Sequence, residues 1–406
     1  MVRRMIRSLL IRLYGLYRRV RLWALGLRGR TEEDVHAQRL VTGQAWEDYC
    51  DTLKAAGAAL LHGDAPLDPF NQIEGYRYLA RLTRAGLEAF IDHADPAFPS
   101  LRRMVHETVK MGADNPDNAY YNAQISGRYT YEVRGTRGTV HYLGFGLQRG
   151  GYAEDGGLQT SAYLESEDMR FAEDGSFTIR LSPTPPAEGG NWMQTHDNTS
   201  MLIVRQTFLD RVHEREAELE IVCLDGPPNP GPLTAESLDQ GLTKAAGLVA
   251  ASSMIFARWA NEFKAGHPNL LPRFDQARSD AAGGVPDIAY YHSYWQLGPD
   301  EALVIEATPP ECDHWNFQLN NWWMEALDYR YYSVHVNKFT ARYRPDGSVR
   351  VIVAHRDPGR AHDSWIETTG HELGTMCWRW TRAQGGEPPS PRCRVMRFDE
   401  LAGLPE

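Results

Sequence analysis

Polar and apolar side chains alternate in the segment HWNFQLN, residues 314–320. Successive side chains of a β-strand point to opposite faces, so the four polar side chains would share one face. Imidazole and carboxamide groups in a row offer hydrogen-bond donors and acceptors to a hydroxyl-bearing ligand. We therefore predict a substrate-binding surface made of His314, Asn316, Gln318 and Asn320, with Trp315 and Trp322 as aromatic walls.

A second polar alternation follows in YYSVHVNKF, where His335 and Asn337 occupy one face of a predicted strand. If this strand pairs with residues 314–320, the two polar faces meet in one pocket. A histidine titrates near neutral pH and can act as a general acid or base. We predict that His314 or His335 moves the proton and that the neighbouring amides orient the substrate. An ordinary surface or core histidine is the alternative interpretation of His335.

Two further places carry candidate groups. The loop SWIETTGHELG contains Glu367 and His371, next to glycines that permit a sharp turn. A carboxylate and an imidazole can exchange protons with a substrate that both of them reach. The similar segments DNAYYNAQI and DIAYYHSYW add aromatic and amide groups for substrate contact, namely Tyr121, Asn122 and Tyr291.

The similarity between these two segments extends along the chain. Tyr120 precedes Tyr290 by 170 residues, and Arg205 precedes Arg379 by 174. Landmarks of this kind that keep their order with so little drift indicate a tandem duplication. Because both copies also keep a tryptophan, we assign the repeated tryptophan and arginine to the architecture. The other collinear pairs are Phe145 and Phe317, the Asp-Gly-Ser triplets at 174–176 and 346–348, and Trp192 and Trp365.

The polar strand differs from its counterpart in the first copy. Both strands keep an apolar face, but the polar face of 314–320 corresponds to Tyr142, Gly144, Gly146 and Gln148, which is nearly bare. A polar outer face is normal for an antiparallel sheet in contact with solvent, and this is the alternative to a site. The concentration of amides and imidazole in one copy favours a site.

Hydrophobic periodicity defines the elements that would position these groups. Residues 31–110 and 231–286 show helical spacing, whereas residues 111–230 and 287–400 show short alternating runs between turn residues. We predict a mostly β protein with helical additions (α+β). Two tandem jelly-roll or β-sandwich domains would be preceded and joined by helices. Because helices do not alternate with strands inside either copy, a parallel α/β sheet is disfavoured.

Charge and cysteine content narrow the class of protein. The formal net charge is −10, and residues 1–30 contain nine arginines and no acidic residue, so the rest of the chain is more acidic still. An acidic surface disfavours nucleic-acid binding. The five cysteines form no CxxC motif, so we expect a reduced, cytoplasmic protein without a disulfide framework.

The basic N-terminal segment, residues 1–30, has apolar residues at helical spacing beside an arginine face. A basic amphipathic helix can lie on an anionic membrane surface, which would place the protein at the inner membrane. Packing on the acidic body or on a partner subunit in a homo-oligomer is the alternative. No apolar run reaches the length that spans a bilayer.

Cofactor motifs are missing from the sequence. No GxGxxG opens a βα unit, and no GxxxxGK[ST] or GxSxG occurs. The segment ECDH, residues 311–314, holds ligand-type residues, but neighbouring strand side chains point to opposite faces and cannot all reach one ion. We expect neither a cofactor nor a metal.

Several motifs resemble one bacterial family. The segments DNAYYNAQISGRYTYEVRGTRGTVHYLGF, NWMQTHDNTSMLIVRQTFLDR, YWQLGPDEALVIEATPPECDHWNFQLNNWW and HRDPGRAHDSWIETTGHELGTMCWRW are similar to the family catalogued as domain of unknown function 1214. The likeness covers roughly residues 105–400. It implies jelly-roll-like β domains with helical additions and brings no established catalytic residues.

Two functions remain open on the sequence. The first is a cofactor-free lyase, hydratase or hydrolase that acts by acid–base chemistry on a hydroxylated, largely apolar molecule such as a terpenoid, steroid or lipid. The second is a non-catalytic protein that binds glycans or lipids or builds an assembly. A single cavity lined by the predicted residues would favour the enzyme.

Overall fold

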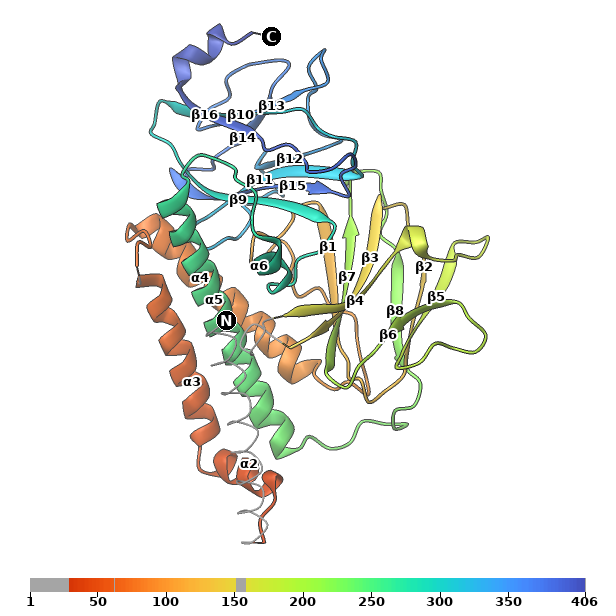
Figure 1. The fold of residues 1–406 in the computed structure, drawn as a ribbon. Coiled ribbons are helices and arrows are strands. Elements are labelled where there is room, and N and C mark those ends of the chain that lie inside the picture. Colours follow the sequence, from red (N-terminus) through yellow and green to blue (C-terminus); the bar gives the residue numbers. More distant parts are fainter. Residues whose placement is uncertain (1–28, 62, 151–157, 406) are drawn as a thin grey trace, which may run out of the picture.

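The computed structural model describes residues 29–61, 63–150 and 158–405 (Figure 1). The predicted amphipathic helix at residues 1–30 therefore lies outside the described residues, apart from Gly29 and Arg30. Across the described ranges, no helix combines the length and apolarity that crossing a membrane requires. Two β domains lie side by side, and a layer of long helices covers one side of the pair (Figure 1).

The helical layer contains α2 (Glu32–Val41), α3 (Gln44–Gly57), α4 (Pro69–Leu87) and α5 (Ala235–Gly266). Local signals begin these helices: the side chains of Thr31, Asp68 and Thr234 each accept a hydrogen bond from a backbone N–H of the first turn. The 32-residue α5 joins the two β domains and packs on α3 and α4. The short elements η1 (Ala58–Leu61), η2 (Glu88–Asp92) and α6 (Gln276–Asp280) extend this layer.

The first helical region is shorter than predicted. Its last helical turn ends at Asp92, and the chain then runs without further helix to residue 117. Pro96 and Pro99 explain the difference, because proline lacks the amide hydrogen that a helix interior needs.

The first β domain is a sandwich of two four-stranded sheets, ordered β1-β7-β3-β4 and β6-β5-β2-β8. Phe145, Val133 and Ile179, which come from both sheets, are fully buried between them. The strands are β1 (Asn118–Gln124), β2 (Tyr131–Thr136), β3 (Tyr142–Arg149), β4 (Gln159–Glu165), β5 (Ser176–Ser182), β6 (Asn191–Gln194), β7 (Thr199–Thr207) and β8 (Glu218–Cys223); η3 (Ser166–Asp168) follows β4.

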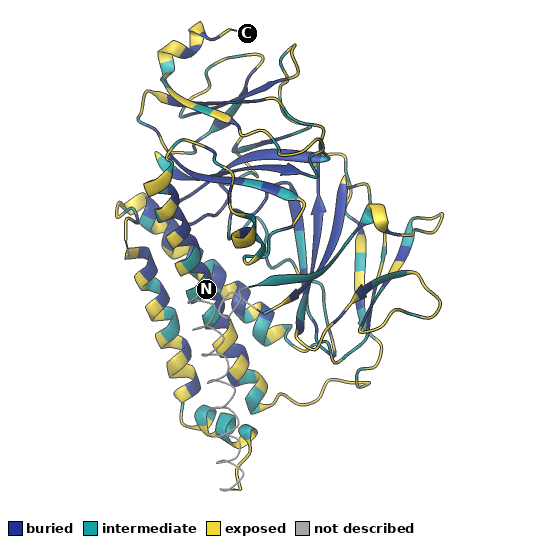
Figure 2. Ribbon diagram, in the orientation of Figure 1, coloured by how far each residue is buried: buried dark blue, intermediate teal, exposed yellow. Residues whose placement is uncertain are grey.

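The second β domain has the same order eight strands later, β9-β15-β11-β12 and β14-β13-β10-β16. Trp315, Phe317 and Trp378 from one sheet meet Leu303 and Val351 from the other in a buried core. Several strands of this domain carry the dark blue of buried residues in Figure 2. The strands are β9 (Ile288–Gln296), β10 (Glu301–Ala307), β11 (His314–Asn320), β12 (His335–Asn337), β13 (Val349–Ala354), β14 (Ser364–Glu367), β15 (Leu373–Thr381) and β16 (Arg392–Arg397), followed by η4 (Phe398–Gly403).

The correspondence between the domains extends to individual contacts. Tyr120 lies opposite Arg205 across β1 and β7, and Tyr290 lies opposite Arg379 across β9 and β15. The indole N–H of Trp192 donates to the Ser182 carbonyl at 3.2 Å, and that of Trp365 donates to the Ala354 carbonyl at 3.1 Å. Both tryptophans lie on short strands that run parallel to their neighbours, β6 beside β5 and β14 beside β13. The mostly β fold with helical additions is confirmed, and the landmarks that predicted a duplication are structurally equivalent.

Candidate functional site

Four predicted site residues meet around a buried carboxylate that the sequence analysis did not single out. Asp117, in the segment before β1, is 1% exposed. Nε2 of His314 and of His335 lie 3.3 Å and 3.2 Å from its two oxygens. The amide nitrogens of Asn316 and Asn337 donate hydrogen bonds to the same oxygens at 3.0 Å and 2.9 Å. The predicted pairing of the two polar strands is correct, because β11 and β12 are neighbours in one sheet.

This cluster is a contact between the two domains. Asn316 also donates to the Asn115 side chain at 2.6 Å, and Gln318 donates to the Asp114 carbonyl at 2.8 Å. Asn316 and Gln318 are both fully buried. The polar face of β11 is therefore covered by residues 113–117 of the other domain, and this corrects the expectation that the face opens onto a ligand.

Two imidazoles face the buried carboxylate at the centre of the cluster. Burial by itself would raise the pKa of Asp117, but the neighbouring His335 and His314 hold that pKa far below its usual range. The carboxylate therefore stays ionised at any pH at which the protein would be studied. A buried charge held in this way stabilises one arrangement of the domains, because breaking the pair would leave the charge uncompensated.

The corresponding face of the first domain is also filled. A Cβ atom on Gly144 would lie 2.4 Å from the hydroxyl of Tyr163, so glycine leaves room for that ring. The Tyr163 and Tyr142 hydroxyls are 2.7 Å apart, and Tyr142 donates to Glu165 at 2.6 Å. The face that is nearly bare in sequence is thus occupied by side chains of the neighbouring strand β4.

The remaining predicted residues lie apart from this cluster. Asn320 accepts from Gln318 at 2.6 Å, on the same covered face. In the loop after β14, His371 lies 2.7 Å from Glu74 of α4, and Glu367 is half-buried. Two of the others are core residues: Trp315 stacks on Trp378, and Trp322 lies in the core beside α5. The two remaining tyrosines form structural hydrogen bonds. Tyr121 donates to Glu216 at 2.6 Å, and Tyr291 donates to the Pro388 carbonyl at 2.9 Å.

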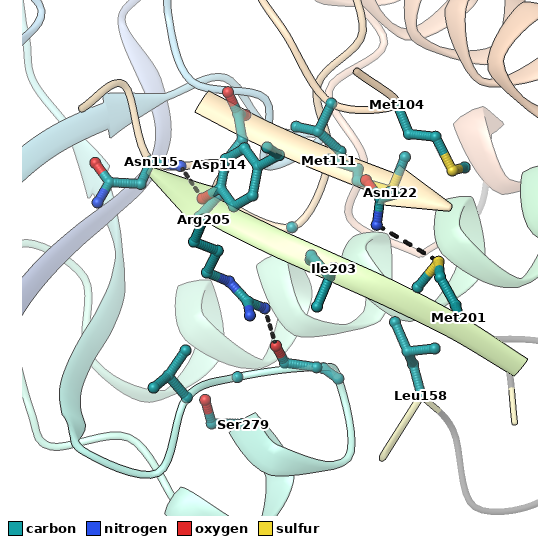
Figure 3. A pocket seen from close by; sticks show the side chains of 18 of the residues that line it. Met104, Met111, Asp114, Asn115, Asn122, Leu158, Met201, Ile203, Arg205 and Ser279 are labelled. Atoms are coloured by element: carbon teal, nitrogen blue, oxygen red, sulfur yellow. Dashed lines mark hydrogen bonds between the residues drawn. The ribbon is translucent and has the colours of Figure 1, made fainter. Parts of the chain in front are cut away.

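A cavity of about 630 Å³ lies between the two domains, beneath α5 (Figure 3). Asn122 is the one predicted site residue that lines it, and its amide lies 3.4 Å from the sulfur of Met201. The apolar part of the wall comes from the segment before β1, from β7 and from α5. Its members include Met104, Met111, Met201, Ile203, Leu248, Phe256 and Trp259.

The polar part of the wall is built from equivalent residues of the two domains. Tyr120 and Arg205 come from the first domain, and Tyr290 and Arg379 come from the second; all four line the cavity. Each tyrosine is opposite its arginine in the sheet of its own domain. The two sheets meet through the faces that point away from their own sandwich cores, which brings the equivalent pairs together.

The two arginines differ in how they are held. Arg379 donates to Gln318 at 2.5 Å, to Asn316 at 3.3 Å and to the Ala113 carbonyl. Arg205 donates to the Gly283 carbonyl at 2.7 Å, and its Nη1 is buried with no hydrogen-bond partner among the described residues. Figure 3 shows Arg205 reaching from β7 toward the loop that carries Gly283. Arg205 therefore retains an unused donor at the cavity.

Both tyrosine hydroxyls are positioned by the backbone. The amide of Asn115 donates to the Tyr120 hydroxyl at 3.0 Å, and the amide of Val285 donates to the Tyr290 hydroxyl at 3.3 Å. Burial raises the pKa of both phenols, that of Tyr290 to about 12, so both are protonated at neutral pH. Because each hydroxyl oxygen already accepts a bond, each hydroxyl hydrogen is available to a ligand.

Two titratable groups of the wall are shifted toward their neutral forms. Burial lowers the pKa of His292 to about 3, so this imidazole is uncharged at neutral pH. Burial raises the pKa of Asp114 to about 6, against the opposing effect of Lys110. Asp114 also accepts a hydrogen bond from the amide of Ala326 at 3.0 Å. A carboxyl group with this pKa can release and take up a proton close to neutral pH.

Sequence reasoning missed the arginines and tyrosines of the cavity for a definable reason. Retention in both copies favours an architectural role, but the copies face each other, so a retained residue occurs twice in one site. The alternation rule also places Tyr120, and not Tyr121, on the face of β1 that Asn122 shares. The usable signal was the collinear landmark set itself, which contained both Tyr120–Tyr290 and Arg205–Arg379.

Comparison with known proteins supports these assignments of fold. The family model described as Protein of unknown function (DUF1214) matches residues 154–207 in the first β domain and residues 302–384 in the second. A crystal structure of an uncharacterized protein from Burkholderia cenocepacia is 48% identical and has a TM-score of 0.86; the match covers 91% of this chain and 100% of that chain. The VPA0106 protein from Vibrio parahaemolyticus is 13% identical, with a TM-score of 0.45, and the match covers 80% of this chain and 98% of that one.

Among curated proteins, none matches this chain. The family that the repeated motifs suggested is the one that the comparison identifies. At 48% identity over nearly the whole length, the Burkholderia protein has the same two-domain fold. The chain belongs to the DUF1214 family.

Proposed function

We propose that the protein binds a largely apolar small molecule that carries oxygen atoms, in the cavity between its two β domains. The observation that carries the proposal is the cavity itself: about 630 Å³ lined by residues of both domains and of α5. Small-molecule sites typically measure roughly 300–1,000 Å³ and combine apolar walls with a few fixed polar groups. The methionines and aromatic residues of the wall are the apolar part, and the arginines and tyrosines are the polar part.

Polar atoms without partners support this proposal. Three such atoms belong to residues that line the cavity: Nη1 of Arg205, Oδ1 of Asn118 and Nδ1 of His292. Buried polar atoms are nearly always hydrogen-bonded, and each one left unpaired costs about 1–3 kcal/mol. The unpaired Nη1 of Arg205 needs an acceptor and the unpaired Oδ1 of Asn118 needs a donor, so a ligand that carries a hydroxyl group suits both.

A thermal-shift screen tests the proposal. Lipids, terpenoids and glycans are each added to the full-length protein, and we expect an apolar, oxygenated compound to raise the melting temperature because it binds only the folded state. Ile203→Phe adds a larger side chain to the cavity wall and should abolish that rise. Val212→Phe makes the same kind of enlargement at a side chain that is 82% exposed and should preserve it. An equal rise in melting temperature for the original protein and both variants would contradict the proposal. So would the absence of a rise with every compound.

A reaction on the bound molecule is the second candidate, favoured by Asp114. Its pKa of about 6 suits a group that passes a proton to or from a substrate in a lyase, hydratase or hydrolase. This moves the candidate acid–base group from His314 and His335, which face Asp117, to a carboxyl group at the cavity. Asp114→Asn should abolish turnover of a compound found in the screen while leaving its binding within threefold. Unchanged turnover in this variant would remove Asp114 as the proton carrier.

We further propose that residues 1–30 attach the protein to an anionic membrane surface. The support is the sequence: nine arginines, no acidic residue and apolar residues at helical spacing. Deletion of residues 1–30 should release the protein from vesicles that contain phosphatidylglycerol. Undiminished co-sedimentation of the truncated chain with those vesicles would contradict this location.

A further inference from the structure

We infer that the ligand of the interdomain cavity is an amphipathic anion, whose oxyanion headgroup lies between Arg205 and Arg379 and whose apolar body extends toward α5. The inference rests on the proposed binding function and specifies its ligand class. It comes from an imbalance of charge in the cavity wall.

Neither guanidinium has a carboxylate partner. Within residues 29–61, 63–150 and 158–405, no Asp or Glu oxygen lies within ion-pair distance of Arg205 or Arg379, although both side chains are at least nine-tenths buried. The partners of Arg379 are two side-chain amides and a backbone carbonyl, and the partner of Arg205 is a backbone carbonyl. Buried charges in proteins are normally paired, because leaving water costs several kcal/mol per ion.

Among the described residues, no acidic group forms a direct ion pair with these guanidiniums. Asp114, the carboxyl group that shares the cavity wall, interacts with both Lys110 and Arg379 only at longer range. Glu165 reaches the region through Tyr142, and it is ion-paired with Arg382 at 2.7 Å. An external anion is therefore the missing partner of the two cavity arginines.

Neighbouring donors extend the same headgroup site. The hydroxyl hydrogens of Tyr120 and Tyr290 have no acceptor among the described residues, and the guanidinium of Arg379 lies 5.8 Å from the ring centre of Tyr290. The Tyr163 hydroxyl lies 2.7 Å from that of Tyr142 and also interacts with the Arg205 guanidinium, whose Nη1 has no hydrogen-bond partner among the described residues. Two guanidiniums and two phenols form a set of donors only, which suits carboxylate or phosphate oxygens, because these accept and do not donate.

The opposite end of the cavity fixes the apolar part of the ligand. Met104 and Met201 lie at the end remote from Arg205 (Figure 3), and Leu248, Phe256 and Trp259 of α5 line the same cavity. Methionine and aromatic side chains adapt to flexible apolar chains. The geometry therefore requires a charged end and an apolar end in one molecule.

Matched ligands separate the headgroup from the body. The full-length protein is titrated at pH 8 with decanoate, decyl phosphate and decanol, each below its micelle concentration, and dissociation constants are measured by calorimetry. We expect both anions to bind at least tenfold more tightly than decanol, and the tighter of the two identifies the oxyanion. Arg205→Gln should reduce this preference to within threefold without weakening decanol binding. Arg205 is chosen because it has a single protein partner, whereas Arg379 also holds the interdomain amides.

Arg170→Gln is the control, because it removes the same charge from an exposed side chain of the first domain and should leave the preference intact. Equal affinities for decanol and decanoate in the unmodified protein would overturn the anion inference and leave the proposed binding function standing. A preference for the anions that survives Arg205→Gln would also overturn it. If none of the three compounds binds, the proposed function fails and the inference fails with it.

Discussion

Asn316 of the second domain donates a hydrogen bond of 2.6 Å to Asn115, which precedes it by 201 residues. Both side chains are buried, and the neighbouring Asp117 accepts a second bond from the same amide at 3.0 Å. The contact between the domains is thus buried and polar. Such contacts are specific in geometry, because each unpaired group in them costs free energy.

Asp117→Asn should destabilise the protein by about 3–5 kcal/mol. The substitution preserves the shape of the side chain, but it removes the charge that faces His314 and His335 and turns an acceptor into a donor against the amides of Asn316 and Asn337. Urea denaturation at pH 7 measures the change. Asp197→Asn, at an exposed position, is the control and should stay within about 0.5 kcal/mol of the original protein. An equally small effect at Asp117 would show that the cluster does not hold the domains together.

His314→Ala distinguishes a structural role from a catalytic one. Because His314 faces the buried Asp117, we expect the variant to lose about 1–3 kcal/mol of unfolding free energy, since one of the two imidazoles beside the buried carboxylate is removed. The affinity for a cavity ligand should change less than threefold, since His314 is not among the residues that line the cavity. Denaturation and calorimetry measure the two effects. Unchanged stability together with lost ligand turnover would restore the histidine as the proton carrier.

The buried His292 should make the protein less stable in mild acid. Its pKa falls from 6.5 to about 3 on folding. Between those values the unfolded chain binds more protons than the folded one, so the free energy of unfolding decreases as the pH falls from 6.5 toward 3. At about 1.4 kcal/mol per pH unit, the loss at pH 5 is about 2 kcal/mol relative to pH 7.

His292→Phe keeps the ring between Tyr290 and Phe263 and removes the titrating group. Between pH 7 and pH 5, the free energy of unfolding of the original protein should therefore decrease by about 2 kcal/mol more than that of the variant. His362→Phe, at an exposed position, should show no such shift. Parallel pH profiles for the original protein and His292→Phe would mean that the imidazole is not kept neutral by burial.

Gly112→Ala should disturb the segment that frames the cavity. Gly112 has φ +64°, and an added Cβ would lie 2.7 Å from the ring of Phe256. Gly385 has a similar φ of +83° with no atom within 4 Å of a Cβ, so Gly385→Ala isolates the backbone strain from the steric clash. We expect Gly112→Ala to cost about 1–3 kcal/mol more than Gly385→Ala in thermal or urea unfolding. Equal costs would show that Phe256 moves aside freely.

Local pattern accounts for much of the fold. Alternation in residues 314–320 correctly places Trp315, Phe317 and Leu319 in the core, where all three are fully buried. The duplication was visible because turns and cross-strand pairs repeat as units; for example, Gly175 and Gly347 have nearly the same φ, +80° and +79°. These features depend on neighbours within one strand or one turn, which a sequence records directly.

The candidate site was harder to predict, because it depends on how two finished domains meet. Alternation identifies the polar face of β11 but contains nothing about Asn115 and Asp117, which cover it from another domain. In the same way, the sequence alone suggests that Arg205 and its repeat counterpart Arg379 are structural residues. The structure shows that both line the same cavity. Contacts between distant segments leave no period in the sequence, so local rules cannot find them.

The segment before β1, residues 113–117, contacts both the cavity and the second domain. The Ala113 carbonyl accepts a bond from Arg379 at the cavity, and four residues later Asp117 is held by Asn337 of the second domain. A ligand that shifts Arg379 would therefore also shift residues 113–117, the same short segment that forms the contact between the domains. The coupling between the two is reciprocal. If ligand binding changes the equilibrium constant of the interdomain contact by some factor, then breaking that contact changes the ligand affinity by the same factor. A small molecule in the cavity would then change how tightly the two domains are held together.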